Sequence, residues 1–468
     1  HAPDRLRPGV TSERITAEAA GHLADLAEKL RTRGHDPQAV ARFLDRIVFC
    51  LFAEDIGLLP EHLFSNLIGK TRTEPARFSK YVGDLFSAMA AGGDFLLQNI
   101  RHFNGNLFTD DAVLELGTDE LAILEGVSRL DWSAIDASIF GTLFERGMDP
   151  GKRAQLGAHY TGRHDIEALV EPVVMQPLRL QWQEVRGAVT CLLATGRKPK
   201  AGGSAADWAG LPAPTGAKLK KARGEAAALV QAFLHRLSSV AVLDPACGSG
   251  NFLYITLQKL KDSEKEVILY AMDNGLGSFL PAVGPWQLYG IEINPYAFDL
   301  AQMTVWIGYL QWTRANGFGV TQDPVLRPMA GNFQCKDAIL DLGDPDNPTE
   351  PEWPRVDFIV GNPPFLGDKL MRRELGDAYV EKLRALYAGR IPGQSDLCCY
   401  WFEKARAHIE AGGCRRAGLL ATQGIRGGAN RTLLERVKTP GGIFFAESDR
   451  PWILDGANVH VSMVGFDD

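Results

Sequence analysis

The feature that most constrains the fold is the alternation, after residue 240, of short apolar runs with longer segments of helical spacing. Strands that alternate with helices predict right-handed crossovers and a mostly parallel sheet that is covered on both faces. We therefore predict an α/β fold that binds its ligands just after the carboxyl ends of the strands. Strands are predicted at Ala241–Leu243, Leu288–Ile293, Val356–Val360, Ala417–Ala421, Ile443–Ala446 and Val459–Phe466, and helices at Asn251–Leu260 and Tyr296–Trp312.

A glycine-rich turn follows the first predicted strand. In the string Asp244-Pro245-Ala246-Cys247-Gly248-Ser249-Gly250-Asn251-Phe252, a strand ends in an acid, turns through two glycines and opens a helix. Glycines let the backbone approach a ligand closely, and a helix N-terminus supplies unpaired N–H groups. The dinucleotide pattern G-x-G-x-x-G is not met, because Leu253 occupies the position of the last glycine. The whole string D-P-A-C-G-S-G is a more specific signal than G-x-G alone.

An acid ends the second predicted strand. Glu292, in Tyr289-Gly290-Ile291-Glu292-Ile293-Asn294, is placed to accept hydrogen bonds from two ribose hydroxyls. It lies 42 residues beyond Gly250, whereas the usual interval in nucleotide-binding sheets is roughly 20 residues. We attribute the excess to an insertion within Lys261–Trp286, where helical periodicity breaks down. A surface acid without function is the alternative.

The most informative motif is Asn362-Pro363-Pro364-Phe365, directly after the third predicted strand. Methylating an amino group requires a weakly nucleophilic nitrogen, whose lone pair is delocalised into its ring, to attack a methyl sulfonium. The site must accept the hydrogens of that nitrogen, which the Asn362 side-chain oxygen and the Pro363 carbonyl can do. Two prolines fix the backbone without competing N–H donors, and Phe365 can stack on a base extruded from its duplex. A rigid turn after a strand is the structural alternative.

The first part of the chain reads as helical. Apolar residues recur at helical spacing in Ala41–Leu58 and Phe78–Met89. No acidic pair followed by Glu-x-Lys, the pattern of a metal-dependent nuclease, is found there. We therefore predict a helical N-terminal domain over residues 1–150, with a spacer or docking role, and a catalytic domain over residues 151–468.

One segment of the catalytic domain has a distinct composition. Between Arg197 and Arg223 the chain is rich in Ala, Gly, Pro, Lys and Arg, with seven basic residues and a single acid, Asp207. This composition predicts a flexible surface insertion. Contact with phosphates is one interpretation of its charge, and a solvated linker is the other.

Composition limits the partners and the compartment. With 50 basic and 57 acidic residues the formal net charge is −7, which argues mildly against a chain covered with DNA-binding surface. Seven cysteines without a C-x-x-C pair, and ten histidines without a cluster, indicate no metal site and suit the reducing cytoplasm. No run of about eighteen apolar residues is present, so no membrane span is predicted.

The strings Asp244–Phe252 and Asn362–Phe365, with Gly157-Ala158-His159-Tyr160-Thr161 upstream, resemble the γ class of amino-methylating DNA methyltransferases. The three motifs occur in the order of that class, over roughly residues 150 to 468. The resemblance implies a Rossmann-like, seven-stranded methyltransferase sheet and S-adenosyl-L-methionine as the cofactor. It also implies that the substrate is the N6 amino group of an adenine flipped out of double-stranded DNA. The residues alone leave N4 of cytosine open.

By that resemblance, Thr161 contacts the methionine carboxylate of the cofactor, and Glu292 contacts its ribose. Asp337 matches the acid that receives the amino group of the cofactor's adenine. Phe365 replaces the tyrosine of N-P-P-Y, which keeps the stacking surface and removes the hydroxyl. The predicted catalytic residues are Asn362, Pro363, Pro364 and Phe365, and the predicted cofactor-binding residues are Tyr160, Thr161, Asp244, Pro245, Ala246, Gly248, Gly250, Glu292, Ile293, Asp337, Ala338 and Asn362. Candidates for phosphate contacts are Lys369, Arg372 and Arg373, for which a solvated helix face is the alternative.

Three further stretches look like the MmeI-like branch of this class: Phe49–Asp55, Ser395–Phe402 and Thr422–Gly428. That branch includes fused type IIL restriction–modification enzymes and solitary methyltransferases of phage-defence systems such as DISARM and BREX. Because no nuclease pattern is found, a defence-system methyltransferase or a fragment fits better. In the γ class a target-recognition domain follows the catalytic domain. We expect it to be absent from this chain or supplied by a partner, with defence-system proteins as further partners.

Two other functions are compatible with parts of the pattern. A protein glutamine methyltransferase also uses N-P-P-Y, but the G-A-H-Y-T element and the large helical N-terminal region argue against it. A non-catalytic DNA-binding scaffold subunit could keep the fold, although every expected site residue is present.

Overall fold

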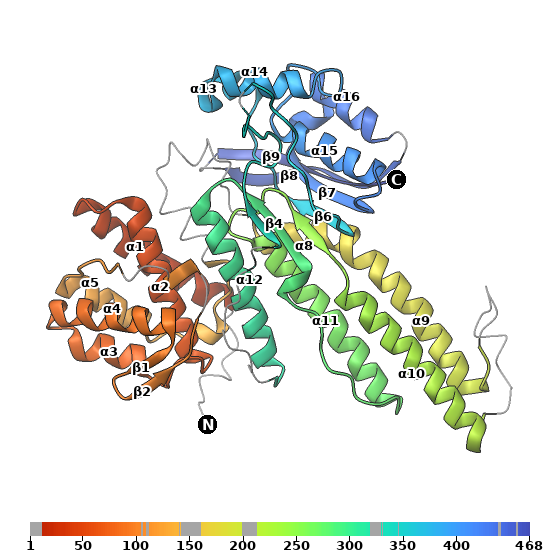
Figure 1. The fold of residues 1–468 in the computed structure, drawn as a ribbon, viewed down its shortest axis with the longest axis horizontal. Helices are drawn as coiled ribbons and strands as arrows, with labels where there is room; N and C mark the ends of the chain where they lie inside the picture. The colour runs from red at the N-terminus through yellow and green to blue at the C-terminus, as the bar shows by residue number, and fades with distance from the viewer. Residues whose placement is uncertain are drawn as a thin grey trace.

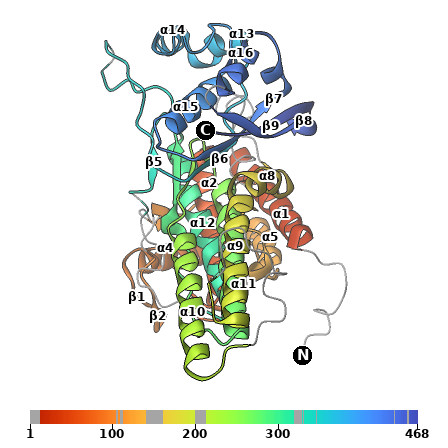
Figure 2. The same ribbon diagram turned by 90° about the vertical axis from the view of Figure 1, so that its right-hand side faces the viewer.

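A computed structural model describes residues 12–103, 106–108, 112–139, 141, 161–198, 213–318, 329, 331–344, 346–438, 441–454 and 457–468. A group of N-terminal helices lies beside a central sheet, and long helices project from the sheet in one direction (Figure 1). A second group of helices covers the other side of the sheet (Figure 2). Among the described helices, none has the length and hydropathy that spanning a bilayer would require.

The N-terminal region is helical, as predicted. Asp36 caps helix α2 by accepting a hydrogen bond from the Ala39 N–H at 2.9 Å, and Pro37 stands in the first turn. Helix α2 ends at Asp55, three residues before the predicted end, because the chain turns at Gly57, where φ is +72°. A short hairpin, β1 and β2, was not predicted. The elements are α1 (Ser12–Thr32), α2 (Pro37–Asp55), α3 (Leu63–Thr71), α4 (Pro75–Ala91), β1 (Gly93–Phe95), β2 (Gln98–Ile100), η2 (Asn106–Phe108), α5 (Thr118–Val127) and η3 (Trp132–Ala134).

Four helical elements precede the sheet: α8 (Arg163–Val170), the π-helical turn η4 (Glu171–Met175), α9 (Gln176–Thr195) and α10 (Gly216–Ser238). The prediction of a flexible insertion over 197–223 is wrong for its last part, because residues 216–223 form the first two turns of α10. Ala, Lys, Leu and Arg dominate this stretch, and all four favour helix. Residues 199–212 of the predicted insertion lie outside the described residues.

Helix α11 (Asn251–Asp273) is longer than predicted. The stretch after Lys261, expected to be an insertion without helical periodicity, continues the helix to Asp273. Two charged residues obscured the pattern, because Lys261 and Glu264 are buried and pair with each other at 3.4 Å. The Lys261 ammonium also lies 4.4 Å from the centre of the Trp312 ring, a favourable cation–π contact. Charged residues on the buried face of a helix interrupt the apolar periodicity from which a helix is predicted.

The central sheet has seven strands in the order β5-β4-β3-β6-β7-β9-β8. Neighbours among β3 to β7 are parallel, and β9 runs antiparallel to both β7 and β8. This confirms the predicted seven-stranded, mostly parallel sheet. Strand β5 was not predicted, because its residues, Phe333-Gln334-Cys335, form no apolar run. The strands are β3 (Val242–Asp244), β4 (Leu288–Glu292), β5 (Phe333–Cys335), β6 (Phe358–Gly361), β7 (Arg416–Thr422), β8 (Gly442–Leu454) and β9 (Ala457–Asp467).

Helices cover both faces of the sheet. Along β6, Phe358 and Val360 belong to the core on one face, and Ile359 belongs to the core on the other, as the two-residue period of a strand requires. Helices α8, α11 and α12 (Pro295–Ala315), with η4, contact the first face. The other core is closed by α13 (Asp368–Leu375), α14 (Asp377–Leu386), α15 (Cys398–Glu410) and α16 (Gly428–Val437), with the short turn η7 (Gln423–Arg426) before α16.

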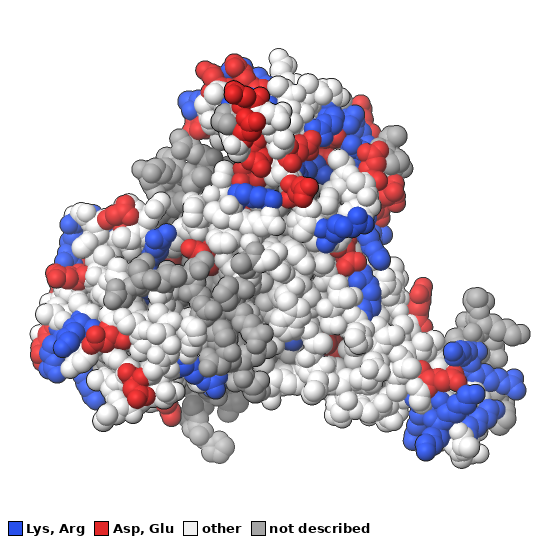
Figure 3. Space-filling model, viewed as in Figure 1, with Lys and Arg blue, Asp and Glu red and all other residues white. Residues whose placement is uncertain are grey.

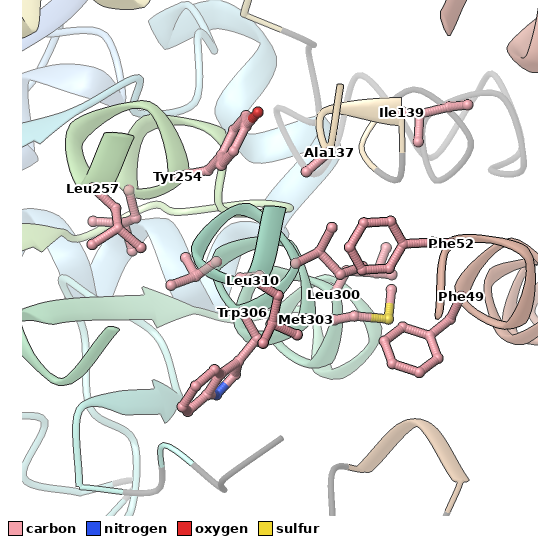
Figure 4. Close-up of a cluster of buried hydrophobic side chains, with 14 of the residues drawn as sticks. Phe49, Phe52, Ala137, Ile139, Tyr254, Leu257, Leu300, Met303, Trp306 and Leu310 are labelled. Atoms are coloured by element: carbon pink, nitrogen blue, oxygen red, sulfur yellow. The ribbon is translucent and has the colours of Figure 1, made fainter. Parts of the chain in front are cut away.

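The N-terminal helices share a core with α12. Phe49 and Phe52 of α2 point toward Leu300 and Met303 of α12 (Figure 4), and all four side chains are buried. Fully burying such side chains stabilises a fold by about 2 kcal/mol each. Helix α12 begins three residues after Glu292, so the N-terminal region supports one wall of the predicted site.

Candidate functional site

The loops after four neighbouring strands meet at one edge of the sheet. Asp244 ends β3, Glu292 ends β4, Asp337 lies two residues beyond β5, and Asn362 directly follows β6. These strands are parallel and adjacent in the order β5-β4-β3-β6, so their carboxyl ends lie together. The strand order reverses between β3 and β6, which is where open α/β sheets bind ligands. The fold thus brings the predicted side chains to one place.

The glycine turn after β3 lies against helix α12. Gly250 has a φ of +85°, and a Cβ there would lie 2.8 Å from the Ala301 carbonyl oxygen, so only glycine fits. Both glycine N–H groups bond within the protein: Gly248 donates to Glu292 Oε2 at 2.9 Å, and Gly250 donates to the Cys247 carbonyl at 2.8 Å. Because these two N–H groups are bonded within the protein, the turn gives the site a backbone shape that a ligand can approach closely. It also helps to hold the Glu292 carboxylate.

Asp244 and Glu292 form an acidic pair under this turn. Asp244 is buried, accepts a hydrogen bond from the Ala246 N–H at 3.0 Å, and fills the space left by the missing side chain of Gly361. Burial raises the pKa of Asp244 to about 8, and the nearby Glu292 charge adds to this shift. Burial also raises the pKa of Glu292, against the opposing effect of the Asn294 N–H, which donates to it at 2.8 Å. A cation bound here would relieve the cost of ionising both groups.

Asp337 is fixed by three hydrogen bonds. Its Oδ1 accepts from the N–H groups of Ile339 at 2.8 Å and Leu340 at 3.1 Å, and its Oδ2 accepts from the Tyr379 hydroxyl at 2.7 Å. Burial, with the Asp337 charge, raises the pKa of Tyr379 well above its usual value, so the hydroxyl stays protonated and donates. Tyr379 comes from α14, and this helix therefore forms a wall of the site that no sequence motif indicated.

Asn362 meets Thr161 across the site. Asn362 Nδ2 donates a hydrogen bond to Thr161 Oγ1 at 3.1 Å, which joins two predicted motifs that are 201 residues apart. Thr161 is buried. Asn362 Oδ1 is also buried, and it has no hydrogen-bond partner among the described residues. The amide is thus oriented by its nitrogen, and its oxygen is left as an acceptor.

A pocket of about 840 Å³, measured with its open mouth, lies over this edge of the sheet. The predicted residues that line it are Pro245, Ala246, Gly248, Glu292, Ile293, Asp337, Ala338, Asn362 and Pro364. Thr161, Asp244, Gly250 and Pro363 are not part of the lining, and Phe365 packs partly buried against the main core. Tyr160 lies outside the described residues.

Eight residues of the lining were not predicted: Ile291, Asn294, Ala297, Lys336, Leu375, Tyr379, Leu397 and Trp401. Leu397 and Trp401 belong to the stretch 395–402, which the sequence indicated only through its resemblance to a family. Trp401 Nε1 donates to the Pro245 carbonyl at 2.9 Å, so this stretch contacts the glycine turn directly.

The same stretch braces the loop that follows N-P-P-F. Asp396 Oδ1 accepts from the Asp368 N–H at 3.2 Å, and the Leu397 N–H donates to the Leu366 carbonyl at 2.9 Å. Asn430, in α16, donates to Asp396 Oδ2 at 2.8 Å and accepts from the Asp396 N–H at 2.9 Å. These contacts explain why residues far from the motif in sequence belong to its structure.

Some of the basic residues that follow N-P-P-F form ion pairs within the protein. Arg372 pairs with Asp377 at 2.7 Å and with Glu381 at 3.2 Å, and Arg373 pairs with Glu374 at 2.5 Å. Lys369 is exposed. In the part of the chain that the structure describes, no group of three or more His, Cys, Asp or Glu side chains is arranged to hold a metal ion.

Two family models match parts of this chain. Residues 219–468, more than half of the chain, match the family model described as the MmeI DNA-methyltransferase domain, and residues 38–108 match the MmeI helicase spacer domain. The chain is 28% identical over 380 residues to DNA methyltransferase A of Bacillus subtilis (strain 168), which covers 76% of this chain and 37% of that protein.

Among solved structures, the chain is similar to the type IIL restriction–modification enzyme MmeI in complex with DNA. The TM-score is 0.73 at 24% sequence identity, over 96% of this chain and 57% of that chain. This likeness confirms the fold. The chain thus spans well under two thirds of the length of both relatives.

Proposed function

The chain belongs to the MmeI DNA-methyltransferase family, and we propose that it methylates the N6 amino group of an adenine flipped out of double-stranded DNA. S-adenosyl-L-methionine is the proposed methyl donor. The proposed setting is bacterial restriction–modification, as in the type IIL enzyme of similar fold, or phage defence. The proposed active site is the pocket at the carboxyl edge of the sheet.

The observation that carries the proposal is the state of the Asn362 amide. Its nitrogen is committed to Thr161, and its buried oxygen has no partner among the described residues. An unpaired acceptor in a buried position costs free energy unless a ligand supplies a donor. The exocyclic amino group of a flipped base supplies such a donor. We infer that Asn362 Oδ1 accepts one hydrogen of the target amino group.

The chain's own groups then have distinct roles in the transfer. Asn362 Oδ1 and the Pro363 carbonyl accept the two amino hydrogens, which draws the nitrogen lone pair out of the ring and toward the methyl group. Pro363 and Pro364 offer no N–H donors that would compete for these acceptors. Phe365, partly exposed beside them, is proposed to stack on the flipped base.

The pocket residues fit S-adenosyl-L-methionine. Glu292 can accept hydrogen bonds from the ribose, and Asp337 Oδ2 keeps a lone pair beside the Tyr379 bond for the adenine amino group. The positive charge of the bound cofactor would favour the ionised forms of Asp244 and Glu292. When it is bound, S-adenosyl-L-methionine would supply an electrophilic methyl group.

The test is methyl transfer from isotopically labelled S-adenosyl-L-methionine by the full-length protein, with duplex DNA and with protein substrates in parallel. Mass analysis of the nucleosides is expected to find N6-methyladenine. N4-methylcytosine would correct the base, and labelled glutamine in protein without labelled DNA would indicate a protein glutamine methyltransferase. Binding of S-adenosyl-L-methionine and DNA without transfer to either substrate would indicate a scaffold.

A further inference from the structure

A cluster of basic side chains lies at the free end of the hairpin that α9 and α10 form. Its described members, all exposed, are Arg197, Lys198, Lys218, Lys220, Lys221 and Arg223. We call this cluster the basic tip. Figure 3 shows a dense patch of basic side chains at the end of this hairpin. Among the described residues of the hairpin end, Glu225 is the acidic neighbour, at 4.0 Å from Lys221.

The hairpin holds the basic tip in a defined position. Trp182 of α9 stacks on Phe233 of α10 and meets the ring of Tyr270 edge-on, with ring centres 5.2 Å apart in both pairs. These contacts fasten both helices to α11. At the free end, a Cβ on Gly196 would lie 3.0 Å from Lys218 Cε, so the end of α9 lies close to the start of α10. The basic side chains are therefore attached to helices that are held in place by packing.

The basic tip lies away from the proposed active site. Helix α10 ends at Ser238 and β3 begins at Val242, so the hairpin projects from the amino ends of the strands, whereas the pocket lies at their carboxyl ends. The 23 residues of α10 extend over about 34 Å at 1.5 Å per residue. None of the residues that line the pocket belongs to the basic tip, so a flipped base held in the pocket does not contact it. Its charge is thus not explained by the proposed function.

The chemistry of the basic tip favours phosphates over a protein surface. Protein interfaces have a buried centre rich in aromatic and apolar residues, and none of the exposed large apolar residues that the structure describes belongs to the basic tip. Lysine and arginine side chains that extend into solvent, as those of the basic tip do, suit binding to a DNA backbone. The rest of the chain is acidic, since the net charge is −7 in spite of these cations.

We propose that the basic tip is a second DNA contact, which binds the phosphates of a duplex segment outside the catalytic pocket. The inference rests on the proposed function only in taking DNA as the polyanion. The DNA affinity that the basic tip contributes is independent of the DNA sequence. It depends steeply on salt because each neutralised phosphate releases bound counterions. The second segment is either a bent continuation of the duplex in the pocket or another part of a long DNA molecule.

The test compares two fourfold variants of the full-length protein. The first replaces Lys218, Lys220, Lys221 and Arg223 with glutamine, which removes charge and keeps helix propensity. The matched control replaces four exposed lysines of other helices, or their ends, with glutamine: Lys29, Lys70, Lys80 and Lys438. Binding to a non-specific duplex is measured as a function of salt, and cofactor affinity is measured for both variants.

The first variant is expected to bind DNA at least tenfold more weakly, with a slope of log affinity against log salt that is smaller by about 2 to 4. The control is expected to stay within about twofold, and both variants are expected to keep the cofactor affinity. An unchanged slope in the first variant, or an equal loss in both, would overturn the proposal. Polyglutamate that competes as well as DNA of equal charge would also overturn it, in favour of an acidic protein partner. The readout is binding, so a failure to methylate DNA would refute the proposed function without affecting this result.

Discussion

Asn362 Nδ2 donates a hydrogen bond to Thr161 Oγ1 over 3.1 Å, and this contact fixes which end of the amide is free. A side-chain amide can rotate by about 180°, which exchanges the positions of its nitrogen and oxygen. A threonine hydroxyl could bond either end, but with Nδ2 committed to it, Oδ1 remains the acceptor. The G-x-x-Y-T and N-P-P-F motifs, which occur together in sequence, therefore also act together in space.

Replacing Asn362 with alanine is expected to lower methyl transfer at saturating cofactor by at least about a hundredfold, as the loss of one preorganised polar group in an active site does. The affinity for S-adenosyl-L-methionine is expected to change little. Single-turnover transfer and calorimetry measure the two effects. An active Asn362→Ala protein would refute the mechanism.

Thr161→Val removes the partner that orients the amide and nearly conserves the side-chain volume. Because a hydrogen bond contributes about 0.5 to 1.5 kcal/mol, transfer at saturating cofactor is expected to fall about three- to tenfold. Thr161→Ser keeps the hydroxyl and should restore most of the rate. Equal rates in the valine and serine variants would show that the hydroxyl does not orient Asn362.

The sequence predicted those parts of the molecule that depend on local patterns. Six of the seven strands contain an apolar run, and the glycine turn and the N-P-P-F loop are fixed sets of residues that directly follow two of these strands. The three residues of β5 carry no such pattern. The predicted helix was shorter than α11, because the buried face of α11 contains the Lys261–Glu264 pair. A pattern of apolar residues assigns charged residues to the exposed face.

The unpredicted part of the site is the part made by contacts between distant residues. Tyr379 reaches Asp337 across 42 residues, and Trp401 reaches Pro245 across 156. Neither side chain lies in a motif whose spacing reveals its partner. Gly248 was predicted to bind the cofactor, but the bond from its N–H to Glu292 was not anticipated, because that bond forms only when β3 and β4 are paired.

Tyr379→Phe is expected to weaken S-adenosyl-L-methionine binding about three- to tenfold, because the Asp337 carboxylate loses the hydrogen bond that fixes Oδ2. The rate at saturating cofactor is expected to stay near that of the unmodified protein. Tyr387→Phe is the matched control: its hydroxyl donates to the Ile339 carbonyl at 3.0 Å, and it is not part of the pocket lining. An equal loss of affinity in both variants would assign the effect to packing.

The pH dependence of stability should report Asp244. Its ordinary pKa of 3.8 is raised to about 8 in the folded chain, so the folded state holds a proton that the unfolded state releases between these values. The free energy of unfolding therefore falls as the pH rises through this window. Asp244→Asn removes that dependence, and its melting temperature should fall less than that of the unmodified chain between about pH 5 and pH 8. Parallel curves for the two proteins would contradict the burial of a protonated Asp244.

The contact between α11 and α12 should set the geometry of the glycine turn, because α11 starts at that turn. A Cβ on Gly308 would lie 2.2 Å from the ring of Tyr254, which is itself buried. Gly308→Ala is expected to destabilise the fold by about 1 to 3 kcal/mol, the usual cost of overpacking, and to weaken cofactor binding by moving α11. Gly69→Ala is the control in α3, where a Cβ meets nothing within 4 Å, and it should stabilise the helix by about 0.5 to 1 kcal/mol. Denaturant unfolding of both variants measures these opposite changes, and a Gly308→Ala protein as stable as the unmodified chain would show that the two helices do not pack this closely.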